Sequence, residues 1–172
     1  LRASGVKNKM SLSGFLETAD VENGKEVEKL LTAFQNNKTL KIDWQHNDAS
    51  KSHRFTIENI DRLKSASSIE LRWDGKPMNM SPRGENIIAI PAQGDFKVLD
   101  VVPVNDAQQY ASVQFSDMIA IGQDLNGLIS ISGQYDISYT INGSEVKVFG
   151  NGKLDGNYTV NVNAGIKNTW GD

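Results

Sequence analysis

The chain has 172 residues, of which 38% are hydrophobic, and its 18 basic and 21 acidic side chains give a formal net charge of −3. This mixed, slightly acidic charge supplies no positive field for a nucleic-acid backbone, so we expect no nucleic-acid partner. The sequence contains no cysteine, which excludes disulfides, thiol nucleophiles and thiolate metal sites but leaves the compartment open. No run of about 18 apolar residues is present, so no transmembrane helix is expected.

The first expected element is a strand over residues 9–18, where apolar and polar residues alternate and Gly14 suggests a bulge or bend. A helix is expected over about residues 24–36. It follows Asn23-Gly24-Lys25-Glu26, which has the form of a capping box. The apolar residues of this helix lie at i, i+3, i+4 and i+7 and would form one face: Val27, Leu30, Leu31 and Phe34. We interpret this face as part of the core of a β-sandwich, in preference to a membrane-binding or partner-binding surface.

Four further strands are expected in the first half, each marked by apolar residues near alternate positions. These residues are Leu40, Ile42 and Trp44; Phe55 and Ile57; Ile69, Leu71 and Trp73; and Ile87, Ile88 and Ile90. Pro91-Ala92-Gln93-Gly94 then interrupts the pattern, because proline cannot continue a central strand and glycine relaxes the backbone. The sequence therefore predicts a first β-sandwich domain over residues 1–92, with one short helix.

The second half predicts another antiparallel β-sandwich, over residues 95–172, with about seven strands at the spacing of an immunoglobulin-like fold. Its clearest element is a hairpin over residues 137–149. Apolar residues alternate on both sides of Asn142-Gly143, a dipeptide favoured in two-residue type I′ turns, where both residues have positive φ. The expected fold class is mostly β, with two tandem antiparallel β-sandwich domains.

Candidate metal ligands are few. His46 and His53 lie on either side of a polar turn that contains Asp48, and a metal site would require all three side chains to converge. Exposed histidines at the strand ends of a hairpin are the favoured interpretation. The aspartates considered as calcium ligands lack a dense cluster and are interpreted as turn residues: Asp124, Asp136 and Asp155. We therefore assign no metal-binding and no cofactor-binding residue.

Catalytic motifs are also missing from the sequence. It has no nucleophile elbow, no phosphate-binding glycine loop and no metalloprotease helix motif, so we expect no enzyme and assign no catalytic residue. The three tryptophans, Trp44, Trp73 and Trp170, would stack on sugar rings if exposed and fill a core if buried. The alternating pattern favours burial.

Several segments of the chain resemble one known family. Those of the second half are residues 113–117 (Val-Gln-Phe-Ser-Asp), 123–129 (Gln-Asp-Leu-Asn-Gly-Leu-Ile), 156–160 (Gly-Asn-Tyr-Thr-Val) and 165–168 (Gly-Ile-Lys-Asn). They are similar to an N-terminal macroglobulin-like domain of bacterial alpha-2-macroglobulins, although Met118 and Ile119 stand where that family usually has Pro-Leu. Residues 17–22 and 73–76 of the first half are similar to the preceding domain in Bacteroidetes-type bacteria.

The resemblance implies a large, multidomain envelope protein that traps proteases after cleavage of a bait region, in many members through a Cys-Gln thioester. This chain has no cysteine for a thioester and no bait-like segment. The implied role is therefore that of a non-catalytic structural part. Its implied partners are neighbouring domains of the same full-length chain, and proteases are the implied targets of the full-length protein.

The resemblance also implies a location in the periplasm or cell envelope, because family members are commonly periplasmic lipoproteins. The chain begins at Leu1 without methionine, which suggests a fragment or a processed product, and a lipid anchor would then lie upstream. No membrane contact by the chain itself is expected. The alternative is a tandem immunoglobulin-like surface module that binds a glycan or a protein.

Overall fold

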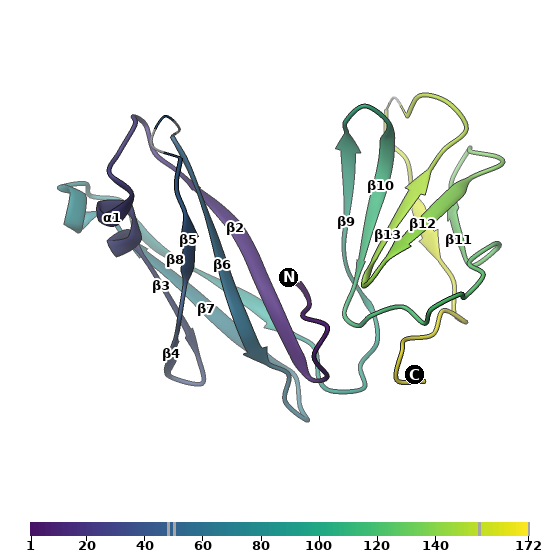
Figure 1. Ribbon diagram of the computed structural model, residues 1–172, viewed down its shortest axis with the longest axis horizontal. Helices are drawn as coiled ribbons and strands as arrows, with labels where there is room; N and C mark the ends of the chain where they lie inside the picture. The colour runs from purple at the N-terminus through teal and green to yellow at the C-terminus, as the bar shows by residue number, and fades with distance from the viewer. Residues whose placement is uncertain (48, 50, 155, 172) are drawn as a thin grey trace. The chain divides into compact units, whose positions relative to one another are not determined.

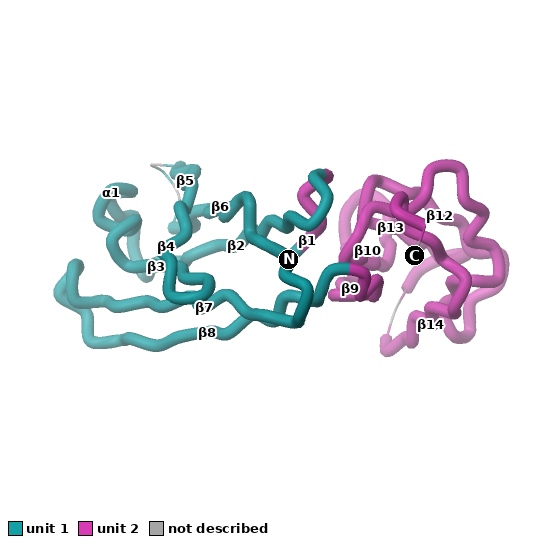
Figure 2. The backbone as a smooth tube through the Cα atoms, turned by 90° about the horizontal axis from the view of Figure 1, so that it is seen from below, with its two compact units in different colours: residues 1, 6–93 teal, residues 2–5, 94–172 magenta. Residues whose placement is uncertain are grey.

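The computed structural model describes residues 1–47, 49, 51–154 and 156–171. Its fold is mostly β, with antiparallel strand pairs and one short helix, which confirms the expected fold class (Figure 1). The contacts divide the chain into unit 1, which comprises Leu1 and Val6–Gln93, and unit 2, which comprises Arg2–Gly5 and Gly94–Asp172 (Figure 2). No helix in the described part of the chain is long and apolar enough to cross a membrane.

Unit 1 contains two antiparallel sheets. In one sheet β2, β6 and β5 lie side by side, and the other has the order β4-β3-β7-β8. The strands are β2 (Lys9–Glu17), β3 (Leu31–Gln35), β4 (Lys38–Leu40), β5 (Asp43–Gln45), β6 (Ser52–Asp61), β7 (Ser67–Asp74) and β8 (Arg83–Ile90). A short 3-10 helix, η2 (Lys76–Met78), joins β7 to β8. The core is formed by fully buried residues from both sheets, among them Met10, Ile57, Ile60, Ile69 and Ile90.

The helix is much shorter than the sequence predicts. It comprises α1 (Gly24–Val27) and a 3-10 turn, η1 (Glu28–Leu30), and the next residues form β3. Leu31, Ala33 and Gln35 are buried at alternate positions because β3 pairs with β7, so the period of two replaces the helical period. The helix expected to continue to residue 36 is therefore wrong beyond Leu30. Its expected end is instead a two-residue hairpin turn in which Asn36 and Asn37 both have positive φ.

The expected capping box is present only in part. Asn23 is the N-cap, but its side chain accepts a hydrogen bond from the N–H of Lys25, at 2.9 Å, and not from that of Glu26. The carboxylate of Glu26 instead accepts from the ammonium group of Lys29, at 2.7 Å. The helix thus begins where the sequence predicts, while its acidic residue pairs along the helical surface.

Two strand predictions in unit 1 need correction. The single strand expected around Ile42 is broken into β4 and β5, which belong to different sheets, so the chain crosses from one sheet to the other at residues 41–42. Gly14 marks no bulge, since the register of β2 against β6 is continuous from Leu12 to Glu17. A Cβ at Gly14 would lie 2.5 Å from the ring of Phe55, so glycine leaves room for this ring.

Unit 2 contains a four-stranded antiparallel sheet of order β12-β13-β10-β9 and a two-stranded sheet of β11 and β14. Its strands are β1 (Arg2–Ala3), β9 (Val98–Asn105), β10 (Gln109–Phe115), β11 (Ile129–Ile131), β12 (Ser138–Asn142), β13 (Glu145–Phe149) and β14 (Val160–Val162). The buried residues of both sheets form one apolar core, with Val113, Leu125, Val146 and Val148 fully buried. The hairpin expected over residues 137–149 is present as β12 and β13.

The turn of this hairpin differs from the expected one. Asn142 pairs with Glu145, so Gly143 and Ser144 are the two central residues. Gly143 has a φ of 64°, and Ser144 is not among the residues with positive φ. Positive φ at the first central position alone is the pattern of a type II′ turn, so the type I′ prediction is wrong.

Candidate functional site

The two histidines of unit 1 form a pair. Their Nδ1 atoms lie 2.9 Å apart, and Nε2 of His46 lies 3.2 Å from a carboxylate oxygen of Glu28 in η1. His53, in β6, is only 1% exposed, and its Nε2 atom has no hydrogen-bond partner. His53 is therefore not the exposed strand-end histidine that the sequence predicts. The first residue of α1 packs against His46, where a Cβ at Gly24 would lie 2.5 Å from the imidazole ring.

One arrangement of protons satisfies both contacts of His46. Its Nε2–H donates to the carboxylate of Glu28, and its Nδ1 accepts from Nδ1–H of His53. The hydrogen bonds between Glu28 and His46 and between His46 and His53 therefore connect η1 to the sheet that contains β5 and β6.

These side chains do not converge as metal ligands. Glu28 and His53 contact opposite nitrogens of the His46 ring, so the three cannot surround one ion. The described part of the chain contains no group of three side chains suited to a metal. Asp48 and Asp155 lie outside the described residues. Asp136 is a turn residue with a φ of 53°, as its interpretation as a turn aspartate predicts.

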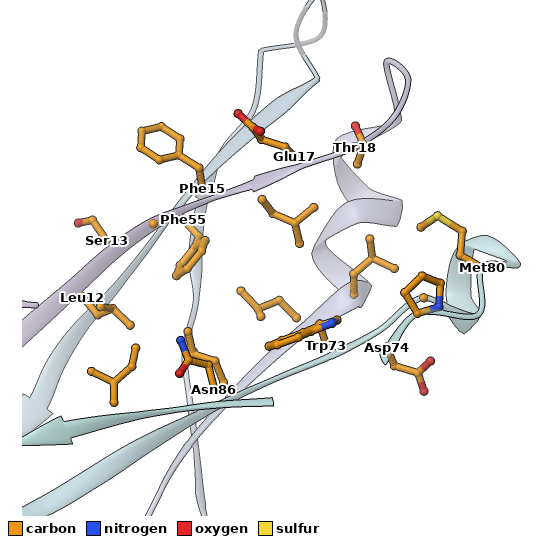
Figure 3. A pocket seen from close by; sticks show the side chains of 18 of the residues that line it. Leu12, Ser13, Phe15, Glu17, Thr18, Phe55, Trp73, Asp74, Met80 and Asn86 are labelled. Carbon is orange, nitrogen blue, oxygen red and sulfur yellow. The ribbon is translucent and has the colours of Figure 1, made fainter. Parts of the chain in front are cut away.

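An apolar cavity of about 620 Å³ lies in unit 1. Its walls come from β2 and β6 of one sheet, from β7 and β8 of the other, and from the segments around η1 and η2 (Figure 3). Among the lining side chains, Trp73 is 39% exposed and Met80 is 41% exposed. Asn86 also lines it, and no hydrogen bond of its amide is present among the described residues. This combination of apolar walls and a polar group is typical of ligand-binding pockets.

The tryptophans are only partly in the expected environment. Trp44 is half-buried and stacks on the ring of His46, with centroids 5.6 Å apart. Trp73 and Trp170 are exposed, so their expected burial is wrong. Trp73 pairs with Gly84 of β8, and a Cβ there would lie 2.5 Å from the indole, so the ring extends across β8 instead of entering the core.

In unit 2, polar side chains hold the segment after β10 against the end of the chain. The amide of Gln123 donates to the carbonyl of Gly165 and accepts from the N–H of Lys167, both at 2.9 Å. The hydroxyl of Tyr139 donates to Asp124 at 2.7 Å and accepts from the N–H of Leu125 at 2.8 Å. We call these residues the clasp: 123–125, Tyr139 and 165–167.

The electrostatics of the clasp follow from these hydrogen bonds. The N–H of Asn126 and the hydroxyl of Tyr139 lower the pKa of Asp124 from its usual value. The hydrogen bond to the Asp124 carboxylate raises the pKa of Tyr139. Both shifts favour the ionised carboxylate and the neutral phenol, the two forms that this hydrogen bond requires.

Further buried polar residues lie in the segment that begins at the end of β10. Ser116 is 1% exposed, and its hydroxyl accepts from the N–H of Lys97 at 3.0 Å. Asp117 is also buried, and Asn168 forms a backbone bridge with Ile119. The motif segments 113–117, 123–129 and 165–168 therefore lie in strands and in the loops that are fastened together in this unit.

Comparison with known proteins gave no match among family models, curated proteins or solved structures.

The sequence does not predict the roles of three residues in these sites. Glu28 belongs to the expected helix, and nothing in its spacing indicates a contact with a histidine 18 residues away. Tyr139 fits the strand alternation, which does not reveal the use of its hydroxyl. Asn86 is the one available signal, because it interrupts the apolar positions of β8 on the side that faces the cavity.

Proposed function

We propose that the chain is a non-catalytic structural part of a bacterial alpha-2-macroglobulin-like protease-trapping inhibitor. In this proposal the two units are rigid β-sandwich modules, similar to macroglobulin-like domains, that space and support the parts of the parent protein that act on proteases. Their partners are neighbouring domains of that protein. The parent is held in the periplasm or cell envelope.

The observation that supports this proposal is the use of the motif residues inside unit 2. Both polar ends of the Gln123 amide bind backbone groups, and Asp124 accepts from a backbone N–H and a tyrosine hydroxyl. Side chains that bind backbone groups and a neighbouring side chain in this way stabilise a loop. A structural role accounts for why these residue types occur at these positions.

The direct test is a capture assay with the isolated chain. Trypsin, chymotrypsin, elastase and subtilisin are each incubated with an excess of the chain and separated on denaturing gels. We expect no covalent adduct and full residual activity of every protease on a protein substrate. A gel-stable adduct, or inhibition at stoichiometric amounts of the chain, would overturn the proposal.

A second candidate function is the tandem immunoglobulin-like module that binds a glycan or a protein, and exposed Trp73 beside the cavity of unit 1 favours it. Tryptophan emission is measured while soluble bacterial and plant polysaccharides are added to the chain and to its Trp73→Phe variant. A shift or quench that Trp73→Phe removes would support glycan binding. Emission that is unchanged by every polysaccharide would exclude this form of the module.

A further inference from the structure

One edge of the second sheet of unit 1, formed by β8, is free to pair with a further strand. β8 is the last strand of the order β4-β3-β7-β8, and in the described part of the chain its eight residues pair with β7 alone. The register is uninterrupted from Ser67 opposite Ile90 to Asp74 opposite Arg83. Alternate N–H and C=O groups of such an edge point away from the sheet and are free to pair with another strand.

This edge lies directly beside the cavity. Asn86 and Ile88 of β8 line one wall, and Leu12 of β2 and Phe55 of β6 line the wall contributed by the other sheet (Figure 3). A strand added next to β8 would direct every second side chain to the same side of the sheet as Asn86 and Ile88. Its inward side chains would therefore cover the cavity and offer a partner to the unpaired amide of Asn86.

The outward side chains of β8 define a second requirement. Ile87 is 65% exposed, and Arg83 is exposed with no ion pair among the described residues, whereas Glu85 between them lies 3.9 Å from Arg72. Arg83 and Ile87 lie on the same face, because they are four positions apart along the strand. Cross-strand neighbours interact when apolar faces apolar and opposite charges face each other, so the complementary strand carries an apolar residue and an acidic residue at this spacing.

We infer that the free edge of β8 binds an extended strand of another polypeptide, with apolar side chains at its inward positions and an acidic and an apolar residue opposite Arg83 and Ile87. Regularly spaced backbone groups select a peptide, since a small apolar molecule has no series of donors and acceptors to match them. The inference stands independently of the structural role proposed above, because it rests on unit 1 and that role rests on unit 2.

The test uses a synthetic probe peptide with fluorescein at one end and solubilising lysines outside the strand. Valine occupies the inward positions and threonine most outward ones, and one glutamate and one isoleucine are placed to face Arg83 and Ile87. Two further versions are N-methylated at alternate residues, one on the inward set and one on the outward set. Because the N–H groups of a strand point alternately to its two sides, one methylated version blocks pairing with β8 and the other leaves it intact.

Binding to the whole chain is measured by fluorescence anisotropy. We expect the probe to bind, one methylated version to bind at least about tenfold more weakly, and the other to bind as well as the probe. The Arg83→Glu variant is expected to weaken binding about threefold or more and to recover it with a probe that carries lysine in place of glutamate. The matched control is Lys38→Glu, which reverses an exposed charge on β4, at the other edge of the same sheet.

Three results would overturn the inference. They are no binding of the probe at about 1 mM, the concentration at which even weak complexes form; equal binding of both methylated versions; and equal effects of Arg83→Glu and Lys38→Glu. Equal binding of the methylated versions would show that the cavity takes apolar groups without strand pairing.

Discussion

Unit 1 and unit 2 are both β-sandwiches, but they use their polar and aromatic residues in opposite ways. In unit 2 the amide of Gln123 binds two backbone groups, and Oδ1 of Asp124 accepts from the N–H of Asn126 and from the hydroxyl of Tyr139. In unit 1 the ring of Trp73 and the amide of Asn86 line an open cavity. This difference supports the two proposals, that the motif residues of unit 2 have a structural role and that unit 1 binds a partner.

The largest effect is expected from Gly143→Val in unit 2. Gly143 has a φ of 64°, and a Cβ there would lie 3.0 Å from the terminal methyl carbon of Met118. A β-branched side chain resists this backbone conformation, so we expect a loss of about 2 kcal/mol in the free energy of unfolding. Denaturant unfolding measures it, with Gly143→Asn as the control that tolerates positive φ. An unchanged midpoint for the valine variant would contradict the observed turn.

The clasp is tested next, by Gln123→Ala. This variant removes two hydrogen bonds to the backbone of residues 165–167, and we expect it to destabilise unit 2 by about 1–2 kcal/mol. Gln108→Ala is the matched control, because Gln108 is exposed and makes no hydrogen bond among the described residues. Equal unfolding midpoints for the two variants would show that the clasp contributes nothing to stability.

A smaller effect is expected from Gly14→Ala in unit 1. The new Cβ would lie 2.5 Å from the ring of Phe55, which is a severe contact in a closed core. Phe55 lines the cavity, however, so its ring has space to move. We expect a cost of about 1 kcal/mol or less in the free energy of unfolding. A loss larger than that of Gly143→Val would show that unit 1 is as closely packed as unit 2.

The smallest effects are expected from pH. The folded pKa of Asp124 is lowered, so its contribution to stability is present above the ordinary aspartate pKa and is lost as the pH falls through the lowered value. The folded pKa of Tyr139 is raised, so its contribution is present below the ordinary tyrosine pKa and is lost as the pH rises through the raised value. Unfolding midpoints of unit 2 should therefore decrease at both extremes.

Three variants distinguish the acid and the alkaline decrease of the unfolding midpoint. Asp124→Asn should remove most of the acid dependence that belongs to the clasp, and Tyr139→Phe should remove the alkaline part. Asp136→Asn, at an exposed turn position with positive φ, should leave both limbs unchanged. Identical pH profiles for all three variants would show that the hydrogen bond between Asp124 and Tyr139 has no influence on folding.

The sequence predicts most strands, because alternation of apolar and polar residues reports directly which side of a strand is buried. It fails at residues 31–36, since the spacing of Leu30, Leu31 and Phe34 fits a helical face as well as a strand. Pairing of β3 with β7 decides the outcome there, and it depends on a segment far along the chain, while the turn at Asn36-Asn37 pairs β3 with the adjacent β4.

The candidate sites are less predictable than the strands. The short separation of His46 and His53 indicates neighbouring strands, but it does not reveal that His53 is buried or that Gly24 of α1 packs against His46. Likewise, exposure of Trp73 follows from the position of β8 at the edge of its sheet. Strand order arises from the topology of the whole unit, which local alternation does not record.

Residue-resolved amide hydrogen exchange of the whole chain tests most directly the claim that the motif residues of unit 2 form an internal clasp. The N–H of Leu125 is held by Tyr139 and that of Lys167 by Gln123. We expect both amides to exchange at least about a hundredfold more slowly than unprotected amides, and the Lys167 amide to lose this protection in Gln123→Ala. Exchange of both amides at unprotected rates in the unaltered chain would contradict the clasp, and with it the structural role proposed for the chain.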